Sequence, residues 1–208
     1  MTARKGGFFK TLSGRFLLLT IAFVMLAEVL ILVPSIARFR ADYLLLRLEK
    51  AQIASLALLT TDEVISPELE AELLVNAGVF NVVLRRDEVR QLVLSSPNPA
   101  AISNTYDLRI SGPWELIRDA FAVLNDPMNR VIRVIGNPVQ QAGLLIEVTM
   151  ETGPLRTAML EYGLRILVLS VLISAVTAVL LFISVQRMIV APIRRVVSHM
   201  QAYAEAPE

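Results

Sequence analysis

His199 is the only histidine in the chain, so any imidazole chemistry depends on this residue. Cysteine is absent, which excludes thiol chemistry. A histidine that accepts phosphate is followed by an acid that polarises its ring and by a proline that bends the helix. The residues after His199 are Met200, Gln201 and Ala202, which supply neither group. We therefore interpret His199 as a polar residue on the outer face of an amphipathic helix. The sequence predicts no catalytic residue, no disulfide and no thiolate metal site.

Glu28 also stands out chemically, because it lies near the middle of an apolar run, residues 16–36. An ionised side chain at the centre of a bilayer costs about 2.5–3.5 kcal/mol on insertion scales, so Glu28 needs a partner or a proton. Ser174 lies at the same depth in a second apolar run, which predicts a hydrogen bond between the two side chains. Ser170, Ser174 and Ala178 form a row of small residues that lets two helices approach closely. These four residues are predicted contacts between membrane helices; the alternative for Glu28 is a tolerated neutral acid.

The two apolar runs, residues 16–36 and 166–185, explain why 55% of the 208 residues are hydrophobic and why the mean hydropathy reaches +0.59. About 20 helical residues, rising 1.5 Å each, span roughly 30 Å, which is the thickness of a bilayer core. Both runs are therefore predicted to be transmembrane helices.

Basic residues set the predicted orientation. Residues 1–15 and 186–208, which flank the two runs, carry an excess of lysine and arginine, so both termini are expected in the cytoplasm and residues 37–165 outside. A signal peptide cleaved after Ala37 is the alternative. The apolar run is longer than a typical signal core, however, and the helical pattern continues past Ala37.

Residues 37–165 mix helical and strand patterns, which predicts an α+β domain bracketed by the two membrane helices. The first membrane helix is predicted to extend outward to about residue 60, since Leu44, Leu48, Ala51 and Leu58 recur at helical spacings. A second helix is predicted between Ser66, its N-cap before Pro67, and Gly78, which follows its end. Further helices are predicted over 113–124 and from Pro154 into the second membrane helix. The predicted strands are 79–84, 89–94, 106–110, 130–135 and 143–150. In the last of them, Glu147 and Thr149 are expected on the face opposite the apolar Leu144, Ile146, Val148 and Met150. Together the strands predict a half-buried antiparallel sheet.

An apolar seam follows the second membrane helix. Ile193, Val196, Met200 and Tyr203 are spaced three, four and three residues apart, which is a coiled-coil period, and Pro192 precedes them. This pattern resembles the first helix of a HAMP linker, in which a proline opens a helix of a dimeric four-helix bundle. The resemblance implies that these five residues relay a signal. The alternative is an amphipathic helix that lies on anionic lipid.

Residues 151–208 further resemble the last outer helix, the second membrane helix and the HAMP entry of alphaproteobacterial sensor histidine kinases. The resemblance implies a homodimer in the bacterial inner membrane. A kinase part that uses ATP and Mg²⁺ and acts on a response regulator would follow. These 208 residues contain no phosphoacceptor or ATP-binding motif, so the chain itself has no predicted enzymatic activity, cofactor or nucleic-acid partner. An input module of a chemoreceptor or membrane cyclase, or a stand-alone truncated membrane binding protein, is the alternative.

The same resemblance implies a PAS-like or Cache-like outer domain, in which a sheet and its helices enclose a pocket for a small ligand. Arg85, Arg109, Tyr106 and Trp114 are the candidate ligand-binding residues. In the alternative, the arginines are solvated charges on loops and strand edges, and Trp114 is a core residue. The identity of the ligand stays open at this point.

Overall fold

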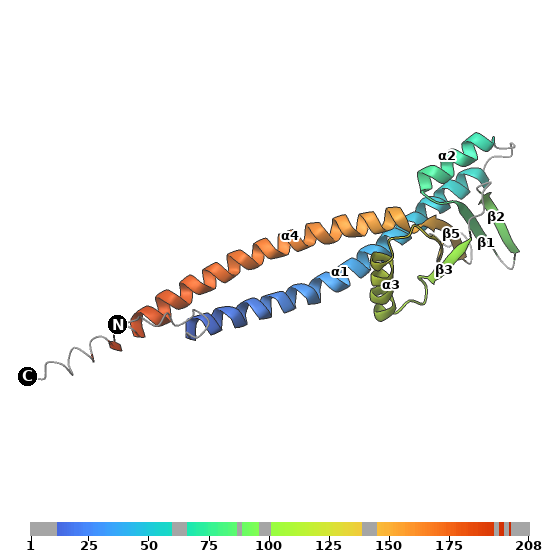
Figure 1. Cartoon of the computed structure of the whole chain (residues 1–208). Coiled ribbons are helices and arrows are strands. Elements are labelled where there is room, and N and C mark those ends of the chain that lie inside the picture. The colour runs from blue at the N-terminus through green and yellow to red at the C-terminus, as the bar shows by residue number, and fades with distance from the viewer. Residues whose placement is uncertain are drawn as a thin grey trace, which may run out of the picture. The chain divides into compact units, whose positions relative to one another are not determined.

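The computed structural model describes residues 12–59, 66–86, 89–95, 101–138, 145–193, 196–197 and 200. Its elements are α1 (Leu12–Leu59), α2 (Pro67–Ala77), β1 (Asn81–Arg86), β2 (Val89–Ser95), β3 (Ile102–Asp107), α3 (Pro113–Asn125), β4 (Val131–Gly136), β5 (Leu145–Glu151), α4 (Thr152–Val185) and the π-helical turn η3 (Gln186–Val190). They form a mixed helix-and-sheet protein (Figure 1) with two compact units, Val33–Leu164 and Met1–Leu32 with Arg165–Glu208. We call the first unit the outer domain, after the side of the membrane on which the sequence predicts it.

Two helical stretches, Leu18–Leu56 and Thr152–Ile193, are long and apolar enough to cross a membrane. Each predicted membrane run lies within one unbroken helix, α1 or α4, and each helix continues into the outer domain as predicted. Pro34 lies inside α1. Because proline has no N–H, the carbonyl four residues earlier lacks its usual helical partner there.

The sheet has five strands in the order β2-β1-β5-β4-β3. The pairs β1–β2, β1–β5 and β4–β5 are antiparallel, but β3 and β4 are parallel. The prediction of an antiparallel sheet is therefore wrong for that pair. The physical reason is the connection: α3 lies between β3 and β4 in the chain and returns it to the starting edge, so the next strand runs in the same direction. The third strand also begins and ends earlier than the predicted 106–110.

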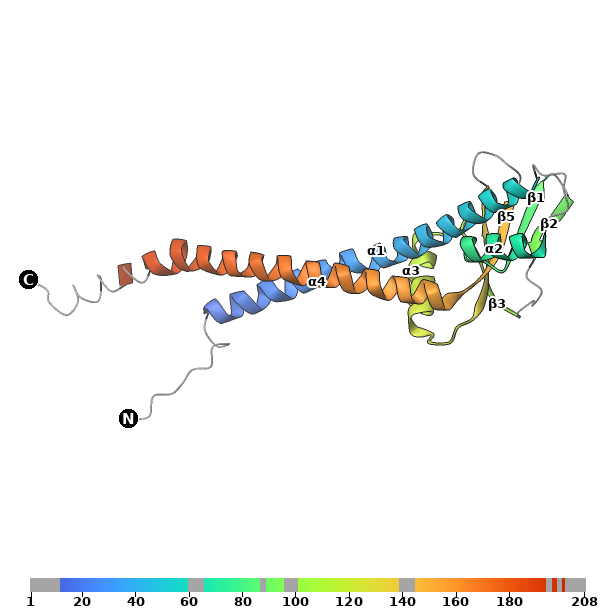
Figure 2. The same cartoon turned by 90° about the horizontal axis from the view of Figure 1, so that it is seen from above.

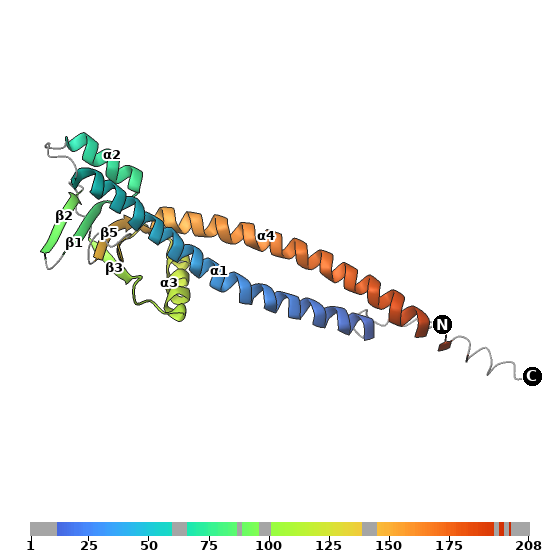
Figure 3. The ribbon, with the colours of Figure 1, turned by 180° about the vertical axis from the view of Figure 1, so that it is seen from behind.

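The core lies between one face of the sheet and α1. Leu44, Leu48 and Ala51, which the sequence places on the apolar stripe of α1, are all buried. A Cβ on Gly136 of β4 would lie 2.5 Å from Leu48 Cδ1, so α1 packs directly on the sheet at this point. The buried strand residues that share this core are Val82, Leu84, Leu94, Ile132, Val134, Ile146, Val148 and Met150. In Figures 1 and 3, α2 and α3 lie on either side of α1 within the domain.

The last strand confirms the predicted alternation with one exception. Ile146, Val148 and Met150 are buried, and Glu147 lies on the opposite face, where it is within 3.9 Å of Arg133. Thr149 also lies on that opposite face, yet it is buried. The strand is therefore covered on both faces near its end, which alternation alone does not predict.

The ends of α2 follow the predicted signals. Ser66 Oγ accepts a hydrogen bond from the Leu69 N–H at 3.3 Å, and Pro67 occupies the first turn. Gly78 follows the helix with φ of 67°, a left-handed conformation that glycine adopts without a steric penalty. Local sequence therefore fixes both ends of α2.

Candidate functional site

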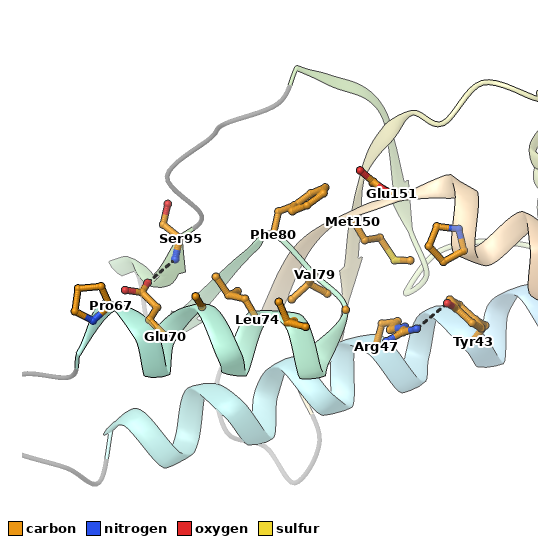
Figure 4. Close-up of a pocket in the computed structure, with 14 residues that line it drawn as sticks. Tyr43, Arg47, Pro67, Glu70, Leu74, Val79, Phe80, Ser95, Met150 and Glu151 are labelled. Carbon is orange, nitrogen blue, oxygen red and sulfur yellow. Dashed lines mark hydrogen bonds between the residues drawn. The ribbon is translucent and has the colours of Figure 1, made fainter.

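A cavity of about 640 Å³ lies in the outer domain between α1, α2 and the sheet. Its walls are mainly apolar. The prolines and larger apolar residues that border it are Pro67, Leu74, Val75, Val79, Phe80, Met150 and Pro154. Figure 4 shows several of these side chains gathered between α2, the strands and α1. A volume of this size falls in the range of small-molecule sites. We call it the α1–α2 cavity.

Both long helices contribute to the wall of this cavity. Tyr43 and Arg47 come from α1, while Pro154 comes from the first turn of α4. An occupant would therefore touch the two helices that contain the candidate membrane spans. Tyr43 and Arg47 are four residues apart and so share one side of α1.

Arg47 joins α1 to α2. Its Nη1 donates a hydrogen bond to the Ala77 carbonyl at 3.0 Å, and its Nη2 donates to the Tyr43 hydroxyl at 2.8 Å. The guanidinium also lies 4.9 Å from the centre of the Tyr43 ring. It fills the space above Gly78, where an added Cβ would overlap Nη1. Arg47 thus closes the end of α2 and forms a polar part of the cavity wall.

Two carboxylates complete the polar part of the cavity. Glu70 Oε1 accepts a hydrogen bond from the Ser95 N–H at 2.9 Å, and Glu151 Oε2 accepts one from Asn129 Nδ2 at 2.7 Å. In Figure 4, Glu70 and Arg47 lie at opposite ends of the group of side chains. The cavity therefore offers an apolar middle with separated polar groups at its ends. This chemistry suits a small organic molecule that is mostly apolar.

A cluster of aromatic and hydroxyl groups joins α1 to α4 within the outer domain. The Tyr162 hydroxyl lies 2.8 Å from Ser35 Oγ, and its ring stacks on Phe39 with centroids 4.3 Å apart. A Cβ on Gly163 would lie 3.3 Å from Ile36, so the two helices are close here. We call Ser35, Phe39 and Tyr162 the clasp. Any relative displacement of the two helices in this domain must be accommodated by the clasp.

Arg40 is a fully buried arginine between α1, β3 and α3. Its guanidinium carbon lies 4.3 Å from the centre of the Tyr106 ring, and Nη1 lies 4.0 Å from Asp119 Oδ2. Among the described residues, none of its three side-chain nitrogens has a hydrogen-bond partner. Burying a charge with so few partners costs free energy that packing elsewhere must offset. The sequence gives no signal for this arrangement, because Arg40 follows the membrane run as an ordinary flanking charge.

The four predicted ligand residues do not meet in the α1–α2 cavity. Arg85 is exposed on β1, opposite Arg90 in the register, and Tyr106 lies under Arg40 and borders a separate small cavity. Trp114 is 82% exposed, so the alternative prediction that it belongs to the core is wrong. It lies in the first turn of α3 on the side opposite the buried Ala120 and Val123.

Arg109 is held by the carboxylate of Asp107, two residues earlier in the sequence. Its Nε and Nη2 donate to the two oxygens of Asp107 at 2.9 and 2.6 Å. The Arg109 hydrogen bonds lower the pKa of Asp107, and the same pairing raises the pKa of Arg109. Arg109 is thus an ion-paired residue of the loop after β3. This is closer to the alternative prediction of a loop charge than to a ligand-binding role.

The predicted membrane contact is present in the second unit. Ser174 Oγ donates a hydrogen bond to Glu28 Oε1, and Ser170, Ser174 and Ala178 are less exposed than the residues around them on α4. This row therefore faces α1 of the same chain. Its predicted role in packing between two chains stays a prediction.

The seam residues lie partly beyond the described region. Pro192, Ile193, Val196 and Met200 are exposed in a helical segment that follows η3, while Tyr203 and His199 lie outside the described side chains. Their role in signal relay stays a prediction. In the part of the chain that the structure describes, no group of three or more acidic or histidine residues could hold a metal ion.

The residues of the α1–α2 cavity were not predicted from sequence. Tyr43 and Arg47 lie beside the buried stripe of α1, and their four-residue spacing was the signal that could have marked them. No protein-family model, no curated protein and no solved structure matches the chain.

Proposed function

We propose that this chain is the sensing and transmembrane part of a HAMP-containing sensor histidine kinase, with a PAS-like or Cache-like outer domain. It works as a homodimer in the bacterial inner membrane, with both termini in the cytoplasm. The kinase part lies outside these 208 residues. A small, mostly apolar molecule binds in the α1–α2 cavity and is the signal.

One observation carries the proposal: α1 and α4 both border the cavity and both continue into apolar stretches long enough to cross a membrane. An occupant that pushes Pro154 away from Tyr43 displaces α4 relative to α1. Helix shifts of about 1–2 Å are typical of such transitions. The clasp then receives the displacement, because Tyr162 follows Pro154 by eight residues and Phe39 precedes Tyr43 by four, in both cases toward the apolar stretches.

The PAS-like or Cache-like assignment is supported by a five-stranded sheet with helices over one face and a cavity beneath them. The parallel β3–β4 pair departs from the expected antiparallel sheet. The departure lies at the sheet edge opposite β2, whereas the cavity is bordered by the β1, β2 and β5 side. The ligand-binding part of the proposal does not depend on the parallel pair.

A chimaera tests the proposal directly. The chain is fused after Met200 to the remaining HAMP and kinase parts of a characterised sensor kinase, and the output is read from a reporter gene. Ala71→Trp adds an indole inside the cavity, and Glu72→Trp adds the same group to the neighbouring α2 position, which does not border the cavity. We expect Ala71→Trp to change the reporter output several-fold and Glu72→Trp to leave it unchanged.

Equal outputs from both variants would contradict a role for the cavity in signalling. The output class is tested separately by the DNA sequence after the Glu208 codon. A reading frame that continues into a phosphoacceptor helix and an ATP-binding domain supports the kinase. A frame that continues into methylation heptads or a cyclase domain would replace it with the chemoreceptor or cyclase alternative.

A further inference from the structure

We infer that the tip of α3, formed by Ile110 and Trp114, rests in the headgroup region of the lipid bilayer, beside the point where α1 enters it. The inference requires that α1 crosses the membrane. It requires neither a ligand in the α1–α2 cavity nor a kinase output.

The two large apolar side chains of the tip are unusually exposed to solvent. Trp114 is 82% exposed and Ile110 is 79% exposed, and no other large apolar side chain in the described part of the outer domain is more exposed than these two. Tryptophan is highly buried on average in soluble proteins. Two large apolar side chains on either side of Pro113 therefore indicate a surface that contacts something other than water.

The contacts of α3 with α1 show which residues of α1 lie at the same level as the tip. A small cavity of about 190 Å³ is bordered by Pro113, Leu116 and Ile117 from the start of α3 and by residues from Pro34 to Asp42 of α1. Arg38 lies in the middle of this segment and is the first charged residue after Glu28. The first turn of α3 therefore lies at the level where the apolar run of α1 ends.

The other end of α3 lies farther from this level. Arg156 Nε donates a hydrogen bond to the Leu124 carbonyl at 3.1 Å, which ties the end of α3 to the start of α4. Arg156 precedes Tyr162 of the clasp by six residues, or roughly 9 Å along a helix. Because Tyr162 contacts Ser35 and Phe39, α3 slopes toward the apolar end of α1, with Trp114 at its lower end. Figures 1, 2 and 3 all show α3 beside α1 within the outer domain.

The charges around the tip fit a phosphate surface. The Arg118 side chain is 75% exposed and follows Trp114 by four residues, so both lie on one side of α3. The Arg38 side chain is 84% exposed and lies 3.9 Å from Asp42. Long arginine side chains can extend from an apolar surface to lipid phosphates. The nearby Glu115 carboxylate is engaged, since it accepts a hydrogen bond from the Gly112 N–H at 3.0 Å.

The size of the tip favours lipid over a second protein chain. An aromatic side chain buries about 150–250 Å², so two large side chains bury a few hundred Å² at most. Specific protein interfaces bury at least about 1,200 Å² in total. In contrast, tryptophan at the headgroup level is a common anchor of membrane proteins. A patch of two side chains is therefore adequate for lipid contact and too small for a stable protein interface.

The chain contains one tryptophan, so the fluorescence of Trp114 tests the inference without any substitution. The full chain is reconstituted into phosphatidylcholine–phosphatidylglycerol vesicles, and flotation first establishes that it is membrane-bound. We expect a blue-shifted emission relative to the chain in denaturant and protection from iodide. Lipids brominated near the headgroup end of the acyl chain should quench Trp114 more than lipids brominated near its methyl end.

A matched control moves the indole away from the bilayer. Ile53 is 61% exposed on the same helix α1, and 15 residues separate it from Arg38, or roughly 22 Å. In the variant Trp114→Phe with Ile53→Trp, we expect iodide quenching and no quenching by brominated lipid.

Two outcomes would overturn the inference. If Trp114 emits at the wavelength of tryptophan in water and iodide quenches it fully, the tip lies in solvent. Blue-shifted emission that brominated lipids do not quench would place it against protein instead. Failure of the chain to float with vesicles would contradict the membrane assignment itself and is distinguished by that first step.

Discussion

Because the Arg47 guanidinium lies over Gly78, we predict that substitutions of Arg47 and Gly78 are energetically coupled. Gly78 has φ of 67°, and an added Cβ would overlap Arg47 Nη1. A left-handed conformation costs an L-residue about 1–2 kcal/mol. Displacing the guanidinium also loses its hydrogen bond to the Ala77 carbonyl, and hydrogen bonds of charged groups contribute about 1.5–3 kcal/mol. We therefore expect Gly78→Ala to destabilise the outer domain by roughly 2–5 kcal/mol.

A double-mutant cycle separates the two costs. Arg47→Met removes the guanidinium and keeps an apolar stem of similar length. In that background, Gly78→Ala should cost only the left-handed conformation, about 1–2 kcal/mol, because the added Cβ has no guanidinium to displace. The effects of the two substitutions should therefore be less than additive by about 1.5–3 kcal/mol.

The assay is urea unfolding of the full chain in lipid nanodiscs, followed by the fraction of outer domain that resists a short pulse of protease. The free energy of unfolding is compared among the parent, the two single variants and the double variant. Additive effects within about 0.5 kcal/mol would refute the reasoning, since additivity is the behaviour of independent sites. It would mean that Arg47 moves aside without losing its hydrogen bonds.

Three further predictions use the same chain. Leu44→Ala should destabilise the outer domain by about 2–5 kcal/mol in the same urea assay, whereas Leu45→Ala, at a 47%-exposed neighbour, should change it by less than about 0.5 kcal/mol; similar losses would contradict the core assignment. Because pairing with its arginine lowers the pKa of Asp107, the pair stabilises the fold at neutral pH, and this contribution is lost as the pH falls below the ordinary aspartate value of about 3.9. Asp107→Asn should thus lower the urea midpoint more at pH 7 than in acid, where the pH falls toward the lowered pKa, and a pH-independent difference would exclude this cause. Finally, Val24→Cys with Ala178→Cys, one turn from the Glu28–Ser174 hydrogen bond, should form a disulfide within one chain, and cross-linked dimers alone would contradict intrachain packing.

Local rules predicted the parts of this fold that are encoded locally. Ser66, Pro67 and Gly78 bound α2 as expected, and the apolar stripe of α1 is buried. The Glu28–Ser174 hydrogen bond followed from equal depth in two apolar runs, because helical rise converts sequence position into height. In each case a short stretch of sequence and the regular geometry of the α-helix were sufficient to predict the feature.

The missed features depend on contacts between elements that are distant in sequence. The direction of β3 is set by the crossover through α3, which alternation of side chains does not report. The α1–α2 cavity is bordered by residues from Tyr43 to Pro154, so its existence depends on how three helices pack on the sheet. The buried Arg40 and the exposed Trp114 reverse the average behaviour of their residue types. Such reversals are visible only once the tertiary contacts are known.

The π-helical turn η3 has a geometric consequence for the segment that follows it. A π turn accommodates an additional residue while the helical rod stays continuous. One residue corresponds to about 100° of rotation in an α-helix of 3.6 residues per turn. Ile193 follows Ser174 by 19 residues, and the π turn absorbs one of them, which leaves 18 residues or about five whole α-helical turns. The start of the apolar seam at Ile193 therefore stays in phase with the face of α4 that carries Ser174. Deleting one residue from Gln186–Val190 would therefore leave this phase unchanged, whereas a substitution that made the turn α-helical with every residue kept would rotate the apolar seam by about 100°.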